Sequence, residues 1–231
     1  MRLALITGGS RGLGAALCNE YRGRDWNVIE FSRSGPGIRL DLAETAVAAE
    51  VFAAAFAQVS SLVIDEIVVI NNAAVLGPVG PVAKATPAEI AAHFDTNIIS
   101  AILLARAFIS ACQERDCPKT FVNISSGAAV KGHAGWSLYC ASKAAMENFV
   151  RTLAPEQTSQ RSPIRAINVN PGVMDTAMQA EIRAASVEDF PARERFVGLK
   201  LSGQLSQPEL VATRIADLVA SRPEPGTTVI V

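Results

Sequence analysis

Short apolar runs alternate along the chain with longer amphipathic or alanine-rich segments. The run Ile67-Val68-Val69-Ile70 is typical, and its continuous apolar character favours a strand buried on both faces. Strands are predicted at 3–7, 27–31, 38–40, 67–71, 120–125, 164–170 and 227–231, of which 38–40 is the weakest. The intervening segments are predicted to be helices, at 12–24, 43–60, 87–114, 138–160 and 208–221.

This alternation of strands and helices predicts an α/β fold: a doubly wound, mainly parallel seven-stranded sheet with helices on both faces. The 231 residues, 49% of them hydrophobic, are enough for one such domain with a large core, so residues 1–231 are expected to form a single domain. The stretch 174–206 is the least regular, with scattered charges, Pro191, Gly198 and Gly203. We expect it to leave the sheet and to cover the substrate.

The charge balance favours a small-molecule partner. The chain has 21 basic and 22 acidic residues and no long like-charge run, so neither nucleic acid nor a membrane surface is expected to bind it. Because charged or Asn positions interrupt the apolar stretches, we expect none of them to approach the length of a membrane span. The apolar N-terminal run is too short for the core of a signal peptide. A cytoplasmic protein is the resulting expectation.

No metal site is predicted. The cysteines lack the spacing of metal ligands, and only two histidines could complete a zinc site. Structural thiols in a reducing compartment are the better interpretation. The residues concerned are Cys18, Cys112, Cys117, Cys140, His93 and His133.

A glycine-rich turn follows the first predicted strand and begins the first helix. It reads Thr7-Gly8-Gly9-Ser10-Arg11-Gly12-Leu13-Gly14. Rossmann-type dinucleotide folds hold a pyrophosphate at this place, against the free N–H groups of the helix N-terminus. A glycine turn without a ligand is the alternative, but the position between strand and helix favours phosphate binding.

Tyr139 and Lys143 lie at positions i and i+4 of a predicted helix and hence on one face. A cation about 4 Å from the phenol would interact by roughly 4 kcal/mol at an effective dielectric of about 20. That attraction would lower the pKa of the phenol, ordinarily about 10, by about two to three units. Tyr139 could then donate a proton to a carbonyl oxygen or remove one from an alcohol. Ser126, 13 residues upstream, can hold the substrate oxygen, whereas Ser125 could equally be a structural hydroxyl.

The glycine turn and this constellation together resemble the short-chain dehydrogenase/reductase family. The family's motifs occur in order from residue 7 to residue 176, including Asn71-Asn72-Ala73-Ala74, where the family has glycine in the last position. The resemblance implies an enzyme that transfers hydride between a nicotinamide cofactor and a carbonyl or alcohol. It also implies a catalytic set of Asn97, Ser126, Tyr139 and Lys143, in which Asn97 holds a water that connects Lys143 to solvent. A solvated helix position is the alternative for Asn97.

The same resemblance implies which residues bind the cofactor. The glycine turn would hold the phosphates, Asp41-Leu42 the adenine, Asn72-Ala73 and Lys143 the ribose, and 171–176 the carboxamide. Asp41 could also be a helix N-cap. The full set is Gly8, Ser10, Arg11, Gly12, Leu13, Gly14, Ser32, Arg33, Asp41, Leu42, Asn72, Ala73, Tyr139, Lys143, Pro171, Gly172, Val173 and Thr176.

In the family that the chain resembles, the position 25 residues after the motif threonine, here Thr7, distinguishes NADP from NAD. An acid there bonds the ribose 2′-hydroxyl of NAD, whereas this chain has Ser32 followed by the cation Arg33, and Arg11 offers a second cation. Glu30 is acidic and close, but a full residue separates it from Ser32 in the strand. We therefore expect NADP(H), with NAD-linked alcohol oxidation as the alternative.

Two segments, 135–140 and 171–179, resemble the benzil reductase and sepiapterin reductase branch of the family, and the benzil reductase match is the closer. The resemblance implies reduction of a vicinal diketone or related dicarbonyl with NADPH. The C-terminal aspartate of sepiapterin reductases is missing from 227–231, which argues against a pterin. Ser126, Trp136, Met174 and Met178 would contact the substrate, although the last three could be packing residues. A catalytically inactive NADP sensor is the alternative function; such proteins often lack the Tyr or the Lys that this chain has.

The family also implies a homodimer or homotetramer. Its subunit contact would use the helices that contain Asn97 and Tyr139, with Phe149, Val150 and Leu153 on the apolar face. Packing of these three against the sheet is the alternative. His133, in a loop before Tyr139, could contact substrate or lie on the surface.

Overall fold

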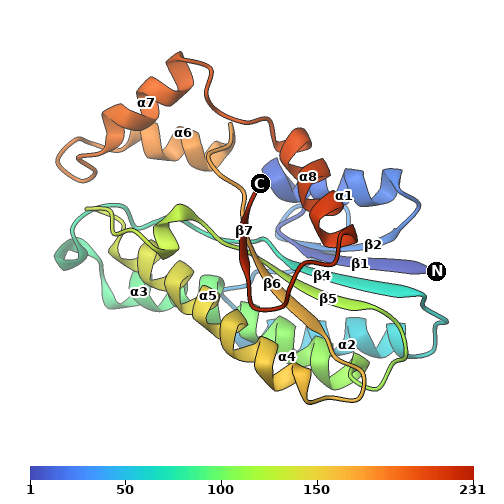
Figure 1. Cartoon of the computed structure of the whole chain (residues 1–231). Helices are drawn as coiled ribbons and strands as arrows, with labels where there is room; N and C mark the ends of the chain where they lie inside the picture. The colour runs from blue at the N-terminus through green and yellow to red at the C-terminus, as the bar shows by residue number, and fades with distance from the viewer.

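A computed structural model describes residues 1–231, apart from the side chain of Ser60. At its centre lies a parallel sheet in the strand order β3-β2-β1-β4-β5-β6-β7 (Figure 1). The strands are β1 (Arg2–Thr7), β2 (Asn27–Ser32), β3 (Ile38–Arg39), β4 (Glu66–Asn71), β5 (Lys119–Ile124), β6 (Arg165–Asn170) and β7 (Thr228–Ile230). This arrangement confirms the predicted seven-stranded, doubly wound sheet within the described part of the chain.

Helices cover both faces of the sheet (Figure 1). α1 and α8 pack on one face and α2, α4 and α5 on the other. The α-helices are α1 (Gly12–Gly23), α2 (Thr45–Ser60), α3 (Pro87–Phe94), α4 (Ser100–Cys112), α5 (Ser137–Thr158), α6 (Ala177–Ala184), α7 (Arg193–Leu201) and α8 (Pro208–Ala220). Shorter helical turns are η1 (Val82–Lys84), the π-helix η2 (Asp95–Ile99) and η3 (Gly127–Ala129).

The sheet has one hydrophobic core on each face, and these two cores explain why the strands are continuous apolar runs. Successive residues of a strand face opposite sides of the sheet, so Leu3 and Leu5 of β1 enter the core under α2, α4 and α5. Ala4 and Ile6 enter the core under α1 and α8. Both sides of the inner strands are therefore apolar, because both are covered.

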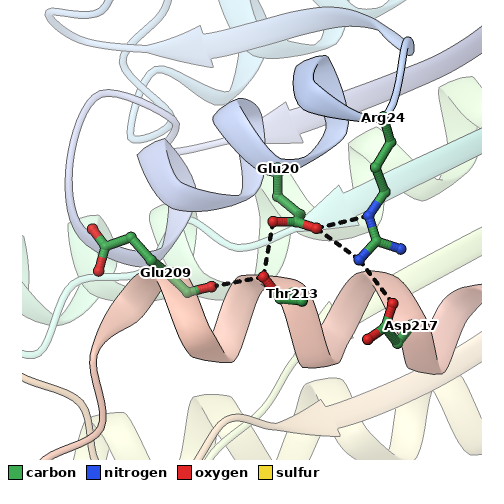
Figure 2. Close-up of polar contacts among 5 residues, drawn as sticks. All are labelled: Glu20, Arg24, Glu209, Thr213 and Asp217. Carbon is green, nitrogen blue, oxygen red and sulfur yellow. Dashed lines mark hydrogen bonds and ion pairs between the residues drawn. The ribbon is translucent and has the colours of Figure 1, made fainter.

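A polar cluster joins α1 to α8 at the edge of their interface. Glu20 accepts hydrogen bonds from Arg24 Nε (2.7 Å) and from the hydroxyl of Thr213 (2.8 Å), and Arg24 also reaches Asp217 (2.7 Å), as Figure 2 shows. The Thr213 hydroxyl also lies 3.2 Å from the carbonyl oxygen of Glu209. These contacts fix α8 against the helix that the glycine turn begins.

The predicted helix 87–114 is interrupted. A π-helix at Asp95–Ile99 separates α3 from α4, and it contains Asn97. Taken together, Pro87–Cys112 is long and apolar enough by length and composition to cross a membrane, so the expectation that no segment reaches this length was wrong. Its few polar positions do not lower the mean hydropathy enough. Core residues on its C-terminal half, including Leu104 and Phe108, pack on the sheet.

Residues 174–206 form α6 and α7 outside the sheet (Figure 1). The two ends of this excursion meet where Ser206 N donates to the Val173 carbonyl (3.0 Å). Its middle is anchored by Phe190, whose ring stacks on Trp136 with centroids 4.4 Å apart and planes 9° from parallel. The excursion is therefore packed on the start of α5, which carries Tyr139.

The proposed subunit face on α5 lies partly inside the chain. Val150 and Leu153 are 0% and 4% exposed and belong to the core under the sheet, and Phe149 packs partly against it. For Val150 and Leu153, intramolecular packing is the correct interpretation, because the helix turns these side chains toward β5 and β6.

Candidate active site

A cavity of about 860 Å³ lies at the carboxyl ends of the strands. Its walls include the turn after β1, residues that follow β2, β4, β5 and β6, and parts of α5, α6 and α7. The order of the strands reverses between β1 and β4, and doubly wound folds bind ligands outside such a switch point.

The glycine turn brings the N-terminus of α1 to the cavity wall. Gly12 has a φ of +54°, in the left-handed region that favours glycine. A Cβ built on Gly14 would lie 2.1 Å from the Gly8 carbonyl oxygen, so this close approach requires a residue without a side chain. Arg11, the N-cap of α1, makes no side-chain cap hydrogen bond in the described structure, which leaves the helix N-terminus open to an anion such as phosphate.

Thr7 fixes the turn against the next strand of the sheet. Its hydroxyl oxygen accepts hydrogen bonds from the backbone N–H groups of Asn72 and Ala73, both at 3.1 Å. Asn72 Nδ2 in turn donates to the Thr7 carbonyl at 2.9 Å. The motif threonine therefore aligns the segment after β4 with the phosphate-binding turn.

Two exposed arginines, Arg11 and Arg33, border the cavity on the side of β2. Ser32 also borders it, and its hydroxyl accepts a hydrogen bond from Gly35 N (2.8 Å). Glu30 is buried and is not among the described residues that line the cavity, because its carboxylate turns under the loop and accepts from Gly37 N (3.1 Å). The acidic residue that could have favoured NAD is thus directed away from the site.

The end of β5 and one turn of α5 bring three predicted catalytic side chains to one wall. Tyr139 and Lys143 both border the cavity although they are only 7% and 6% exposed. Lys143 Nζ donates to the Ile124 carbonyl at 2.8 Å. Ser126 forms a hydrogen bond with the Tyr139 phenol, and its hydroxyl accepts from Ala128 N (3.2 Å).

Burial dominates the protonation of this pair. It raises the pKa of Tyr139 to about 12, against the smaller opposite effect of the Ser126 hydrogen bond. It also lowers the pKa of Lys143 to about 8. The prediction that the ammonium lowers the phenol pKa was therefore wrong for this structure. Nζ lies 5.7 Å from the centroid of the phenol ring, and Lys143 is not among the groups that shift the pKa of Tyr139, which desolvation dominates.

Asn97 is buried in the π-helix, so the alternative of a solvated position was wrong. Its Oδ1 accepts from Val75 N and its Nδ2 donates to the Val75 carbonyl, both at 2.8 Å. Asn97 is not among the described residues that line the cavity, whereas Val75 is. Its side chain therefore acts on the site indirectly, because it holds the backbone of Val75, which lines the cavity.

The cavity brings together the remaining predicted site residues from segments far apart in the sequence. The predicted cofactor residues on its walls include Ser10, Leu13, Asp41, Leu42, Pro171, Gly172, Val173 and Thr176. The predicted substrate residues Trp136, Met174 and Met178 line it as well.

The comparisons with known proteins agree with this arrangement. The family model described as short chain dehydrogenase matches residues 2–186. The chain belongs to this family. It is 34% identical to benzil reductase ((S)-benzoin forming) of Bacillus subtilis (strain 168) over 98% of this chain and 96% of the relative. It is 28% identical to sepiapterin reductase of Xenopus laevis over 94% and 90%.

Among solved structures, the KRED1-Pglu enzyme is 28% identical, with a TM-score of 0.84 that covers 99% of this chain and 100% of the other. These results confirm the predicted family and branch. As a short-chain dehydrogenase the protein is an oxidoreductase with a nicotinamide cofactor. NADP(H) is the expected form, because the glycine cradle fits a pyrophosphate and Arg11 and Arg33 border the site where a 2′-phosphate requires cations.

Sequence reasoning missed several residues of the short-chain dehydrogenase site. Ile182 of α6 and Arg195 and Phe196 of α7 line the cavity without having been assigned to it. His133, which had been left open between a substrate contact and a surface position, lines it as well. The apolar residues belong to a third core cluster that includes Trp136 and Tyr139. The irregular pattern of 174–206 gave no period from which their direction could be inferred.

A buried carboxylate was also missed. Glu147, one turn after Lys143 on α5, accepts a hydrogen bond from the Ser125 hydroxyl at 2.6 Å. Ser125 is therefore a link between β5 and α5, while the adjacent Ser126 faces Tyr139. The position of Glu147 on the catalytic face of the helix was the available signal.

Proposed function

We propose that this short-chain dehydrogenase reduces one carbonyl of a vicinal diketone or related dicarbonyl to an alcohol with NADPH. The observation that carries the proposal is the wall on which Ser126, Tyr139 and Lys143 meet, at the end of a nucleotide-sized cavity. Identity of 34% to a benzil reductase over nearly the whole chain supports the substrate class.

Each catalytic side chain has one task in this proposal. The cofactor supplies a hydride when it is bound. Ser126 donates a hydrogen bond to the substrate carbonyl oxygen, and Tyr139 transfers its proton to that oxygen. A phenol whose pKa is raised to about 12 by burial is protonated at neutral pH and suits the direction of reduction. Lys143, hydrogen-bonded to the end of β5, would hold the nicotinamide ribose.

Asn97 contributes differently. Its amide bonds both backbone groups of Val75, so it would order the cavity wall and, through the backbone around it, the water that links Lys143 to solvent. Asn97 therefore remains in the proposed catalytic set with a role that depends on its neighbours.

The substrate end of the cavity suits an aromatic or alkyl dicarbonyl. Trp136, Met174, Met178 and Phe196 form an apolar wall, and thioether and aromatic groups adapt to flat ligands. We propose that α6 and α7 cover this substrate and that residues 1–231 act as one domain. The homo-oligomer and the cytoplasmic location remain predictions.

The proposal is tested by following nicotinamide absorbance with NADPH or NADH against benzil, other diketones, sepiapterin and simple aldehydes. We expect the highest kcat/KM for a diketone with NADPH. Arg33→Ala should raise the KM for NADPH by roughly tenfold, since a charge-assisted phosphate contact contributes about 1.5–3 kcal/mol, and should leave the KM for NADH unchanged. Preference for NADH in the wild type, unaffected by Arg33→Ala, would overturn the cofactor assignment.

A further inference from the structure

A buried histidine lies directly behind the catalytic wall. His93, in the last turn of α3, is 1% exposed and is not among the described residues that line the cavity. Its Nδ1 lies 2.7 Å from the Gly77 carbonyl oxygen. Its Nε2 lies 3.0 Å from Asn97 Nδ2 and 3.3 Å from the Ser142 hydroxyl. Both ring nitrogens are therefore engaged away from solvent.

The partners of His93 fix where its hydrogen is. A carbonyl oxygen can only accept, so Nδ1 must carry the hydrogen that bonds Gly77. Val75 N donates to Asn97 Oδ1, which makes Nδ2 the amide's donor end. One hydrogen of Nδ2 bonds the Val75 carbonyl, and the other is left for His93 Nε2 or the Ser142 hydroxyl. The network is satisfied by a neutral imidazole whose Nε2 accepts.

The network joins two walls of the site. Val75 and Gly77, held by Asn97 and His93, border the cavity after β4. Ser142 donates to the Tyr139 carbonyl at 2.9 Å, within the turn of α5 that carries the catalytic pair. The π-helix places Asn97 between these walls, at a kind of helical defect that often occurs at functional sites.

We propose that neutral His93 is a positioning residue of the reductase. It fixes the orientation of the Asn97 amide and thereby holds residues 75–77, which form the cavity wall after β4, against the turn of α5 that carries Tyr139 and Lys143. The proposal rests on the proposed carbonyl reduction for its kinetic readout. His93 touches neither substrate nor cofactor in this role; it acts through Asn97, Gly77 and Ser142.

Protonation of His93 would remove the hydrogen bond that its Nε2 accepts from Asn97. A protonated ring would direct Nε2–H at the N–H₂ group of Asn97, so two donors would face each other 3.0 Å apart. Burial lowers the pKa of His93. The backbone hydrogen bonds to Gly77 and Leu138 raise it by a smaller amount, and Lys143 of α5 is the charged group that lowers it further. The contacts from Gly77, Asn97, Leu138 and Ser142 are uncharged. kcat should therefore be constant near neutral pH and decline on the acid side, below the usual histidine pKa of about 6.5.

Two substitutions separate the roles of the ring nitrogens. In His93→Gln the side-chain oxygen can replace Nε2 as acceptor for Asn97 and does not titrate, so kcat should stay within about threefold of wild type and lose its acid decline. In His93→Asn the shorter amide can replace Nδ1 but leaves Asn97 Nδ2 without its acceptor, so kcat should fall by roughly tenfold or more at all pH values. KM for NADPH should change little in either variant.

Gln113→Ala is the matched stability control. It removes the hydrogen bond from Gln113 Nε2 to the Ser162 carbonyl (2.9 Å), just after α4 and remote from the cavity. It should lower Tm without changing kcat or its pH profile. Wild-type kcat in His93→Asn, or an unchanged acid decline in His93→Gln, would overturn the proposal.

A measurement independent of turnover completes the test. Nitrogen NMR of the imidazoles should show His93 as the Nδ1–H tautomer, neutral at neutral pH and titrating below the usual histidine pKa, and His93→Gln identifies its signals by their loss. An Nε2–H tautomer or a ring protonated at neutral pH would overturn the proposal. If the wild type reduces no dicarbonyl, the proposed function fails, while the NMR result still decides the state of His93.

Discussion

Lys143 illustrates the conflict between stability and function at a single residue. Its ammonium is buried beside Tyr139, and burial lowers its pKa from 10.5 to about 8. It makes one hydrogen bond that links α5 to the end of β5. A cation held in this way is available to bind ribose hydroxyls, but the folded state must bear the cost of its desolvation.

Lys143→Met should therefore stabilise the protein while it abolishes activity. The folded-state pKa is lower than the unfolded one, so the unfolded state binds more protons between pH 8 and pH 10.5. Wild-type stability should rise with pH across this window, and the advantage of Lys143→Met, measured by denaturant unfolding, should shrink. A variant less stable than wild type at pH 7 would contradict this account.

The sequence allowed the identity of the catalytic residues to be predicted but not their protonation. Tyr139 and Lys143 are four residues apart on a helix, so they share one face in any fold that keeps the helix. The pKa of the phenol depends on how deeply that face is buried, and this is decided by Trp136 and by residues of α6 and α7 far along the chain. The sequence pattern carries no measure of that burial.

At the scale of elements, α5 is fixed to the sheet by a buried polar ladder. Asn71, Asn123 and Asn168 lie side by side on β4, β5 and β6 and donate in turn, Asn71 to Asn123 at 3.0 Å and Asn123 to Asn168 at 2.8 Å. Asn168 then donates to the Glu147 carbonyl at 3.2 Å. The Glu147 carboxylate also accepts a hydrogen bond from the Ser125 hydroxyl, so the ladder connects the end of β5 with α5.

Glu147→Ala should lower kcat by roughly tenfold with a smaller change in the KM for NADPH, because it leaves the buried Ser125 hydroxyl without an acceptor next to Ser126. Arg151→Met is the control. It removes the half-exposed partner of Glu147 but keeps the Ser125 bond. It should lower stability, because the buried carboxylate loses its cation, while kcat changes by less than about twofold. Equal losses in the two variants, measured with one diketone, would contradict this account, because they would assign the effect to the Arg151–Glu147 ion pair and not to the Ser125 bond.

The break between α3 and α4 shows where sequence reasoning at this scale ends. The apolar period of 87–114 continues through Asn97, so it predicts one helix. The π-helix forms because the Asn97 amide bonds both backbone groups of Val75, a partner 22 residues away. A long-range contact of this kind overrides local helix preference and leaves no mark in the local pattern.

At the scale of the whole molecule, most of the fold follows from rules that act on the sequence. Buried parallel strands joined by helices require cover on both faces and place the loops that carry the motifs at one edge of the sheet. Those rules predict the edge of the sheet at which the cavity lies, whereas most of the residues expected to bind the cofactor came from the resemblance to the family. They could not place α6 and α7, whose position depends on Phe190 stacking against Trp136, two aromatic residues 54 positions apart.

The central claim is that Tyr139 is the proton donor of an NADPH-dependent carbonyl reductase. The most direct test is kcat for reduction of a vicinal diketone by Tyr139→Phe, alongside NADPH affinity measured by cofactor fluorescence. Removing the phenol hydroxyl should lower kcat by about a hundredfold to ten-thousandfold, the usual contribution of a general acid, with NADPH still bound. Activity of Tyr139→Phe equal to that of the wild type would contradict the mechanism.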